Sequence, residues 1–201
     1  METIRSICVY CGSGPGNDPA FIDAAHAFGA ILAKNGITLV YGGGSLGLMG
    51  ATAKSVLEHG GKVVGIIPEF LTDREKALTR AHEMIVTRDM HERKRIMFER
   101  ADAFVALPGG IGTLEELVEQ LTWAQLGRHR KPILILNTNG FWEPFSALIE
   151  HMSKNAFIRP GLNVRILSAS KPEEILPKLR AAAPGSKEVE AIKAATIVQQ
   201  M

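Results

Sequence analysis

The chain of 201 residues has few of the residues that mark several functional classes. It contains 2 cysteines, 6% aromatic residues and a formal net charge of +2. Two cysteines are too few for a disulfide framework. Binding of nucleic acid needs a basic surface and, for single strands, stacking aromatic side chains. Such a small net charge also gives no attraction to an anionic membrane surface. We therefore expect neither nucleic acid nor membrane among the partners.

Long apolar runs are also missing. Glycine or charged residues interrupt every apolar stretch well before the roughly 18 residues that span a membrane. Residues 1–5 show no apolar stretch of the kind found in an export signal. The 6 histidines lack the His-Glu-x-x-His pattern and any clustered ligand spacing. We therefore expect a cytoplasmic protein without a protein-held metal.

The two cysteines form one C-x-x-C pattern. Redox pairs of this spacing normally open a helix, where the helix N-terminus lowers the pKa of a thiol. Cys8 and Cys11 lie instead in the apolar run 4–11, which is typical of a buried strand. Residues three apart on a strand point to opposite faces. We predict two core cysteines with diverging sulfurs.

Short β-branched runs alternate with longer helical patterns along the chain. Predicted strands occupy residues 4–11, 37–41, 62–67, 83–87, 103–107, 132–136 and 164–168. Predicted helices occupy residues 19–35, 47–59, 89–101, 113–126, 142–153 and 172–182. This alternation predicts an α/β fold, a Rossmann-like doubly wound parallel sheet of about seven strands with helices on both faces. We expect one catalytic domain over residues 1–182 and a C-terminal tail over residues 183–201.

Three glycine-rich segments, 12–14, 42–47 and 108–113, each follow a predicted strand. Loops at the carboxyl edge of a parallel sheet bind ligands, and bare N–H groups at a helix start attract anions. The alternative is that the glycines only permit tight turns. Three such loops at one edge favour a phosphorylated ligand, and we place Ser13, Gly43 and Gly44 among its contacts.

The second loop also satisfies a dinucleotide fingerprint through Gly42, Gly44 and Gly47. The acidic residue expected after the next strand is represented only by Glu69, which follows Pro68 and so lies off the strand. A binder of a nicotinamide dinucleotide remains an alternative.

The third loop offers two roles for one carboxylate. Thr113 and Glu116 have the spacing of a capping box, in which the glutamate would bond back to the start of a helix. The same carboxylate would stand beside the glycines of a phosphate site. Position alone does not separate these two readings.

The predicted helix 89–101 carries an unusual arginine. At about 100° per residue, Met90, Met97 and Ala101 share one side, with Arg93 and Lys94 on its two flanks. A charge beside a buried stripe needs an anionic partner. A carboxylate or a ligand phosphate would suit the planar fork of Arg93.

Residues 108–116 match the P-G-G-x-G-T-x-x-E signature of the LOG (Lonely Guy) family of cytokinin riboside 5′-monophosphate phosphoribohydrolases, long called possible lysine decarboxylases. The resemblance covers roughly residues 4–180, with further motifs at 11–13, 41–50, 67–68, 90–94 and 121–127. It implies a Rossmann-like sandwich, usually dimeric, with sites close to the subunit interface. Nothing in the chain resembles the larger framework that holds pyridoxal phosphate in decarboxylases.

The resemblance also implies an activity. Family members hydrolyse the N-glycosidic bond of purine nucleoside 5′-monophosphates, prenylated adenine nucleotides or AMP, and release the base and ribose 5-phosphate without a cofactor. The catalytic residues it implies are Arg93 and Glu116. The substrate-binding residues it implies are Glu75, Arg93, Lys94, Gly110, Ile111, Gly112, Thr113, Leu114, Glu115, Glu116 and Thr122. We expect a homodimeric hydrolase; the alternative is a non-catalytic carrier of a nucleotide or of molybdenum cofactor.

Overall fold

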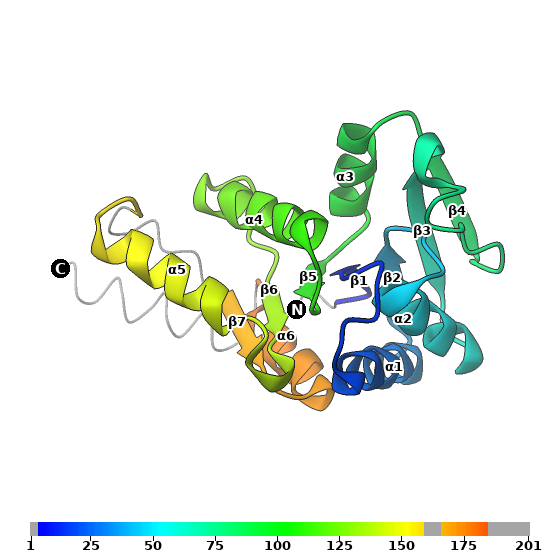
Figure 1. The fold of residues 1–201 in the computed structure, drawn as a ribbon, viewed down its shortest axis with the longest axis horizontal. Helices are drawn as coiled ribbons and strands as arrows, with labels where there is room; N and C mark the ends of the chain where they lie inside the picture. Colours follow the sequence, from blue (N-terminus) through cyan, green and yellow to red (C-terminus); the bar gives the residue numbers. More distant parts are fainter. Residues whose placement is uncertain (1–3, 159–165, 185–201) are drawn as a thin grey trace.

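The computed structural model describes residues 4–158 and 166–184 (Figure 1). Within them, seven strands pair in parallel in one sheet. They are β1 (Ser6–Tyr10), β2 (Thr38–Tyr41), β3 (Val63–Pro68), β4 (Glu83–Thr87), β5 (Ala103–Ala106), β6 (Ile133–Leu136) and β7 (Ile166–Ala169). The strand order is β4-β3-β2-β1-β5-β6-β7. The predicted fold class is confirmed, and the strand ends shift by at most two residues.

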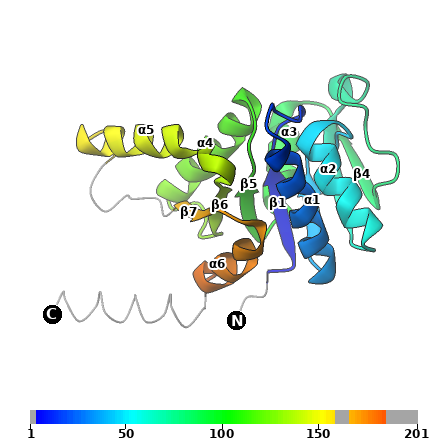
Figure 2. The same cartoon turned by 60° about the horizontal axis from the view of Figure 1, so that its bottom comes forward.

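The described residues also form six α-helices. They are α1 (Pro19–Lys34), α2 (Gly47–Glu58), α3 (Met90–Glu99), α4 (Ile111–Gln125), α5 (Glu143–Lys154) and α6 (Ile175–Ala182). One core cluster contains buried residues of α1, α2 and α6, and a second contains those of α3 and α4. Figure 1 and Figure 2 show these two groups of helices on opposite sides of the strands. None of the helices in the described residues could cross a membrane.

The central strand β1 shows the period-2 alternation of a strand buried on both faces. Ile7 and Val9 belong to the core cluster of α1, α2 and α6, whereas Cys8 and Tyr10 belong to the cluster of α3 and α4. Cys11 returns to the first cluster, so the two cysteines face opposite sides, and both are buried and free. The prediction of two diverging core cysteines is confirmed.

Helix α3 begins at a well-defined position. The Asp89 side chain accepts a hydrogen bond from the Glu92 N–H at 2.8 Å. This cap satisfies one of the free N–H groups at the start of the helix, and it fixes which residues of α3 turn toward the sheet. Arg93, Lys94 and Met97 are the buried residues of this helix. Most of the predicted C-terminal tail, residues 185–201, lies outside the described residues.

Candidate functional site

A cavity of about 280 Å³ opens at the carboxyl edge of the sheet. It receives residues that follow β1 and β5, the start of α3 and α4, and the segment before β4. Its lining residues are Cys11, Gly12, Ser13, Met49, Glu75, Met90, Arg93, Gly110, Ile111, Gly112, Thr113, Glu115 and Glu116. The structure thus brings most of the predicted site residues together.

Two of the glycine loops pack directly on each other to form one wall of the cavity. The Gly12 N–H donates to the Pro108 carbonyl at 3.0 Å. A Cβ at Gly109 would collide with the Thr113 hydroxyl and come within 2.8 Å of the Gly12 nitrogen. Glycine is therefore required at position 109 for the two loops to meet, which is a structural reason for that residue.

The glycines at the start of α4, Gly110 and Gly112, differ from Gly109 in that packing does not explain them. An added Cβ at Gly110 or at Gly112 would meet nothing within 4 Å, so packing does not require glycine there. Such a Cβ at Gly112 would occupy open space at the cavity wall. The first N–H groups of a helix have no intrahelical acceptor, and they bind anions. The start of α4 therefore combines free N–H groups with room for an anionic group.

Of the two roles that the sequence left open for Glu116, the structure does not show the capping box with Thr113. The α4 helix begins at Ile111 with Gly110 as its N-cap, two residues earlier than predicted, and makes no side-chain cap. Ile111 and Gly112 extend the helix toward its N-terminus, although glycine has a low helix propensity. Glu116 consequently lies in the second turn, beyond the reach of a cap. This removes the main structural explanation for its carboxylate.

Glu116 is a carboxylic acid in a nearly dry environment, with 9% of its surface exposed. Burial raises its pKa from the ordinary value of 4.5 to about 7. The positive charge of Arg93 opposes this rise, whereas the negative charges of Glu115 and Glu75 add to it. A group with its pKa near neutrality in a cavity can exchange protons during a reaction.

Arg93 is buried with 5% of its surface exposed, and its guanidinium is held by the sheet. Its Nε donates to the Ile66 carbonyl and its Nη2 to the Gly42 carbonyl, both at 3.1 Å. Nη2 also lies 3.9 Å from the Glu75 carboxylate. The prediction that Arg93 needs an anionic partner is confirmed, although two backbone carbonyls provide its shortest hydrogen bonds.

The second glycine loop, residues 42–47, leaves room for the Arg93 guanidinium. A Cβ at Gly42 would collide with the Arg93 guanidinium, so this glycine is needed for the buried charge. Gly44 pairs with Ala77 in an isolated bridge, and the Leu78 N–H donates to the Gly43 carbonyl at 3.0 Å. Residues 75–78 thereby cover the loop. The structure does not bring Gly43 and Gly44, which we predicted as ligand contacts, to the cavity wall.

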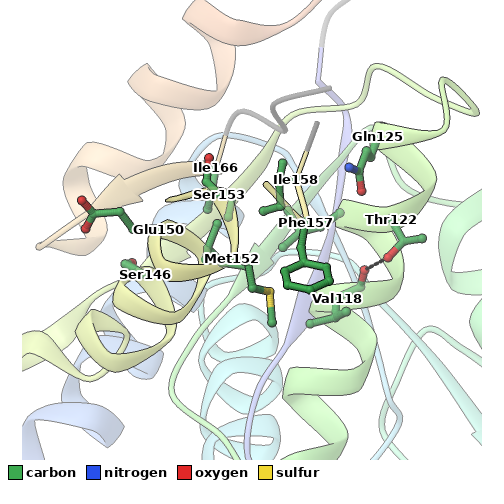
Figure 3. Close-up of a pocket in the computed structure, with 12 residues that line it drawn as sticks. Val118, Thr122, Gln125, Ser146, Glu150, Met152, Ser153, Phe157, Ile158 and Ile166 are labelled. Atoms are coloured by element: carbon green, nitrogen blue, oxygen red, sulfur yellow. Dashed lines mark hydrogen bonds between the residues drawn. The ribbon is translucent and has the colours of Figure 1, made fainter. Parts of the chain in front are cut away.

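Three further predicted contacts also lie off the cavity. The Lys94 Nζ is directed to α4, 2.5 Å from the Glu115 carboxylate. Leu114 packs against the core cluster of α3 and α4. Thr122 lies farther along α4, and its hydroxyl donates to the Val118 carbonyl at 2.8 Å (Figure 3).

Sequence reasoning missed two cavity residues, Met49 and Cys11. It also assigned no ligand contact to Met90, whose sulfur lies 3.8 Å from the Arg93 Nη1 at the cavity wall. Position 11, directly after a predicted strand and before a glycine, was the available signal for Cys11. Burial raises the pKa of its thiol well above the ordinary value. Cys11 is therefore an uncharged residue of the cavity wall.

Thr122 belongs to a second hollow of about 560 Å³ between α4 and α5 (Figure 3). Its walls are largely apolar and include Val118, Met152 and Phe157. Phe157 is 85% exposed, and α5 buries none of its residues in this chain. We refer to this hollow as the α4–α5 groove.

Comparisons with known proteins agree with this architecture. Residues 49–179 match the family model described as "Possible lysine decarboxylase". The cytokinin riboside 5′-monophosphate phosphoribohydrolase LOG of Oryza sativa subsp. japonica is 47% identical over 180 residues, which cover 90% of this chain and 74% of that protein. An enzyme of Arabidopsis thaliana with the same descriptive name is 45% identical over 180 residues, covering 90% and 84%.

A similar fold is found among solved structures. The molybdenum cofactor binding protein of Rippkaea orientalis has a TM-score of 0.67 at 22% identity, covering 90% of this chain and 98% of that one. The molybdenum cofactor carrier protein of Chlamydomonas reinhardtii has a TM-score of 0.63 at 23% identity, covering 90% and 98%. At this identity the likeness concerns the fold.

The sheet and its edge cavity define a Rossmann-like α/β protein whose cavity wall includes the start of α4. The family match and the relatives identify it further: the chain belongs to the LOG family. The resemblance noted from residues 108–116 is confirmed.

Gly112 allows the predicted anion site at the start of α4 to be tested without disturbing the fold. We expect Gly112→Ala to keep or raise the melting temperature, because alanine favours a helix over glycine by about 1 kcal/mol. The new methyl group should lower the affinity for ribose 5-phosphate, measured by calorimetry, by about tenfold or more. Gly14→Ala is the matched control, since its Cβ also meets nothing within 4 Å and Gly14 does not line the cavity. Unchanged affinity in Gly112→Ala contradicts the assignment.

Proposed function

We propose that this protein hydrolyses the N-glycosidic bond of purine nucleoside 5′-monophosphates, with N6-prenylated adenine nucleotides and AMP as substrates. The products are the free base and ribose 5-phosphate. One observation carries the proposal: a buried carboxyl group, Glu116, shares a cavity with the free N–H groups of the helix that bears it. The names of the relatives from Oryza sativa and Arabidopsis thaliana support the same activity.

The spacing of Gly112 and Glu116 suits a ribose 5-phosphate unit. Residues four apart on a helix share a face, about one turn of 5.4 Å apart. A phosphate bound at the first turn of α4 therefore places the sugar over the second turn, where Glu116 lies. The purine would then extend away from the start of the helix.

The chemistry needs a carboxylate at that place. Cleavage of an N-glycoside develops positive charge on the ribose ring and negative charge on the leaving base. An ionised Glu116 stabilises the ring cation and accepts a proton from the water, whose oxygen bonds to the anomeric carbon as the bond to the base nitrogen breaks. The departing base then takes up a proton, from the protonated Glu116 or from solvent, to give the free base. Arg93 favours the ionised form of Glu116, since its charge opposes the rise of the carboxyl pKa, and it orients the carboxylate or neutralises ligand charge. Glu75 binds ribose hydroxyls or the base in this scheme.

The proposal is tested by a base-release screen over AMP, GMP, CMP, N6-isopentenyl-AMP and the corresponding nucleosides. We expect release from the adenine nucleotides and a much lower kcat/KM for adenosine and isopentenyladenosine, because these lack the phosphate that the start of α4 binds. Tight nucleotide binding without base release would support a carrier instead. A kcat/KM for nucleosides equal to that for nucleotides contradicts the phosphate site.

Glu116→Gln separates a catalytic from a structural carboxyl group. We expect kcat to fall by about 10²–10⁴-fold, the usual effect of losing a positioned acid or base.

The stability of the variant relative to the wild type depends on pH. Burial raises the pKa of Glu116 in the folded protein above its value in the unfolded chain. The protonated acid therefore stabilises the fold below about pH 4.5, and this contribution is lost as pH rises through about 7. At pH 8 the variant should therefore melt no lower than the wild type. Glu99→Gln, on the exposed side of α3, is the control. Activity at the wild-type level in Glu116→Gln contradicts the mechanism.

The pH dependence of the reaction should follow the same group. Because Glu116 acts in its ionised form, kcat/KM should rise with pH and reach half of its maximum near pH 7, the value to which burial raises the Glu116 pKa. The residual activity of Glu116→Gln should not show this rise with pH. Initial rates between about pH 5.5 and pH 8.5 provide the measurement. A wild-type profile that is flat over this range contradicts an ionised Glu116 with a raised pKa.

We propose in addition that the protein is a homodimer whose two copies meet at the α4–α5 groove. The apolar side chains of Val118, Met152 and Phe157 are exposed there, and α5 buries no residue within one chain. Contiguous exposed apolar patches of this kind mark interaction sites. Thr122, a substrate contact by family resemblance, lies in this groove and not in the cavity of its own chain. In such a dimer, Thr122 of one copy would lie nearer to the cavity of the other copy.

Light scattering on the wild type should give twice the chain mass of 21.8 kDa. Phe157→Asp should shift the protein to the monomer, because it places a charge in the apolar interface. Phe70→Asp is the matched control, since Phe70 is also exposed, at 59%, but does not line the groove. A wild type that remains monomeric at micromolar concentration contradicts the proposed dimer.

A further inference from the structure

His129 lies in the loop between α4 and β6, and its ring makes two hydrogen bonds that determine its tautomer. The Lys131 N–H donates to Nδ1 at 3.2 Å, so Nδ1 carries no proton. Nε2 lies 3.1 Å from the Gln120 carbonyl, which can only accept, so Nε2 carries the proton. The ring is therefore neutral in this arrangement, and it connects the backbone of α4 to the residues that lead into β6.

The same ring packs against aromatic side chains of two other elements. Its centroid lies 5.3 Å from the ring centroid of Phe98 in α3 and 5.7 Å from that of Phe104 in β5, both in edge-to-face arrangements. The Lys131 ammonium lies 4.0 Å from the Phe98 ring centroid and donates to the Phe98 carbonyl at 2.6 Å. The half-buried histidine thus lies where α3, α4, β5 and the start of β6 meet.

The charges around the ring oppose its protonation. Burial lowers the pKa of His129, and the ammonium of Lys131 lowers it further, whereas the hydrogen bond to the Gln120 carbonyl opposes this decrease. The chain neighbours of the ring, Arg128 and Arg130, are exposed cations as well. A proton on Nδ1 would add a positive charge to this group of cations, and it would also remove the acceptor of the Lys131 N–H.

The carboxylates of this region have other partners. Burial lowers the pKa of the Lys131 ammonium, and the carboxylates of Asp102, before β5, and Glu99, at the end of α3, oppose this decrease. Asp102 also accepts hydrogen bonds from the start of β1, and Glu99 pairs within α3. The Cys8 thiol on β1 is neutral, because burial raises its pKa. None of these groups therefore provides a counter-charge for a protonated His129.

The helix end that this ring contacts also forms part of the α4–α5 groove. The last two turns of α4 line the groove through Leu121, Thr122 and Gln125. The Gln120 carbonyl, which accepts the ring proton of His129, belongs to the same turns. The state of the ring consequently bears on one wall of the groove.

We propose that His129 is a pH-sensitive connection: its neutral ring ties the end of α4 to the start of β6, and protonation of Nδ1 breaks this tie and loosens residues 120–131. The bond that is lost is the one from the Lys131 N–H, because a protonated Nδ1 has no lone pair to accept it. The inference stands on the contacts of the ring and is independent of the proposed activity.

Nitrogen-15 NMR of the histidine rings in the wild type tests the tautomer directly, with the His129 ring assigned through bonds to its own backbone amide. At about pH 7.5 we expect a proton on Nε2 and none on Nδ1. A proton on Nδ1 at this pH overturns the inference. This measurement needs no variant, so it decides the point even if a substitution at position 129 prevents folding.

Hydrogen exchange between about pH 5 and pH 8 tests the effect of protonation. The Leu126 and Arg128 N–H groups donate to carbonyls of α4, and the Lys131 N–H donates to the ring. Because the folded-state pKa of His129 is lowered, its stabilising contribution is present above the unfolded value of about 6.5 and is lost as pH falls through the folded value. We expect the protection factors of these amides to fall by up to about tenfold for each pH unit below about 6.5.

His129→Asn separates the ring from other acidic effects. Asparagine also accepts from the N–H two residues further on, so the turn to Lys131 is kept, but its amide does not titrate. We expect lower protection than in the wild type at about pH 8, because the bond to the Gln120 carbonyl is lost, and no further fall below about pH 6.5. His26→Asn is the matched control, since His26 is exposed on α1 and should leave the wild-type pH dependence unchanged.

Two results of the exchange experiment overturn the inference. Protection factors that stay constant in the wild type between about pH 7.5 and pH 5 would show that the ring does not control this segment. An equal fall of protection in His129→Asn would assign the pH dependence to another group.

Discussion

The buried guanidinium of Arg93 is the interaction on which the site depends. A charge with 5% exposure is stable in the protein only when several polar groups replace its water. The carbonyls of Ile66 and Gly42, at the ends of two neighbouring strands, provide two of these groups, and Glu75 provides a counter-charge. The absence of a side chain at Gly42 follows from this requirement, because a Cβ there would collide with the guanidinium. The charge then acts on Glu116 across the cavity.

The fold was accessible from the sequence because it follows from short-range patterns. Continuous apolar runs such as the one that became β3, separated by helical periods, specify a parallel sheet covered on both faces. The opposite orientation of Cys8 and Cys11 followed from strand geometry alone. The need of Arg93 for a partner followed from its place beside an apolar stripe. In each case the decisive information lay within a few residues of the position concerned.

The rest of the site depends on contacts between distant segments. The start of α4 differs from the prediction because Ile111 and Gly112 take helical conformation, which the propensity of glycine disfavours. Gly43 and Gly44 are covered by residues about thirty positions further on, a pairing that no local pattern indicates. Lys94 has a place in the family motif, yet only the packing of α3 against α4 shows that its ammonium contacts Glu115 and Glu119. The position of Thr122 in the α4–α5 groove likewise follows from tertiary packing.

The central claim is that the start of α4 binds the 5′-phosphate and thereby places the ribose over Glu116. A crystal structure of the Glu116→Gln protein with AMP tests this claim most directly, because the variant should retain the uncleaved nucleotide. The account predicts phosphate oxygens within hydrogen-bond distance of the N–H groups of residues 111–113, and the anomeric carbon beside the side chain of residue 116. A phosphate bound away from the start of α4, or a sugar directed away from residue 116, would contradict it.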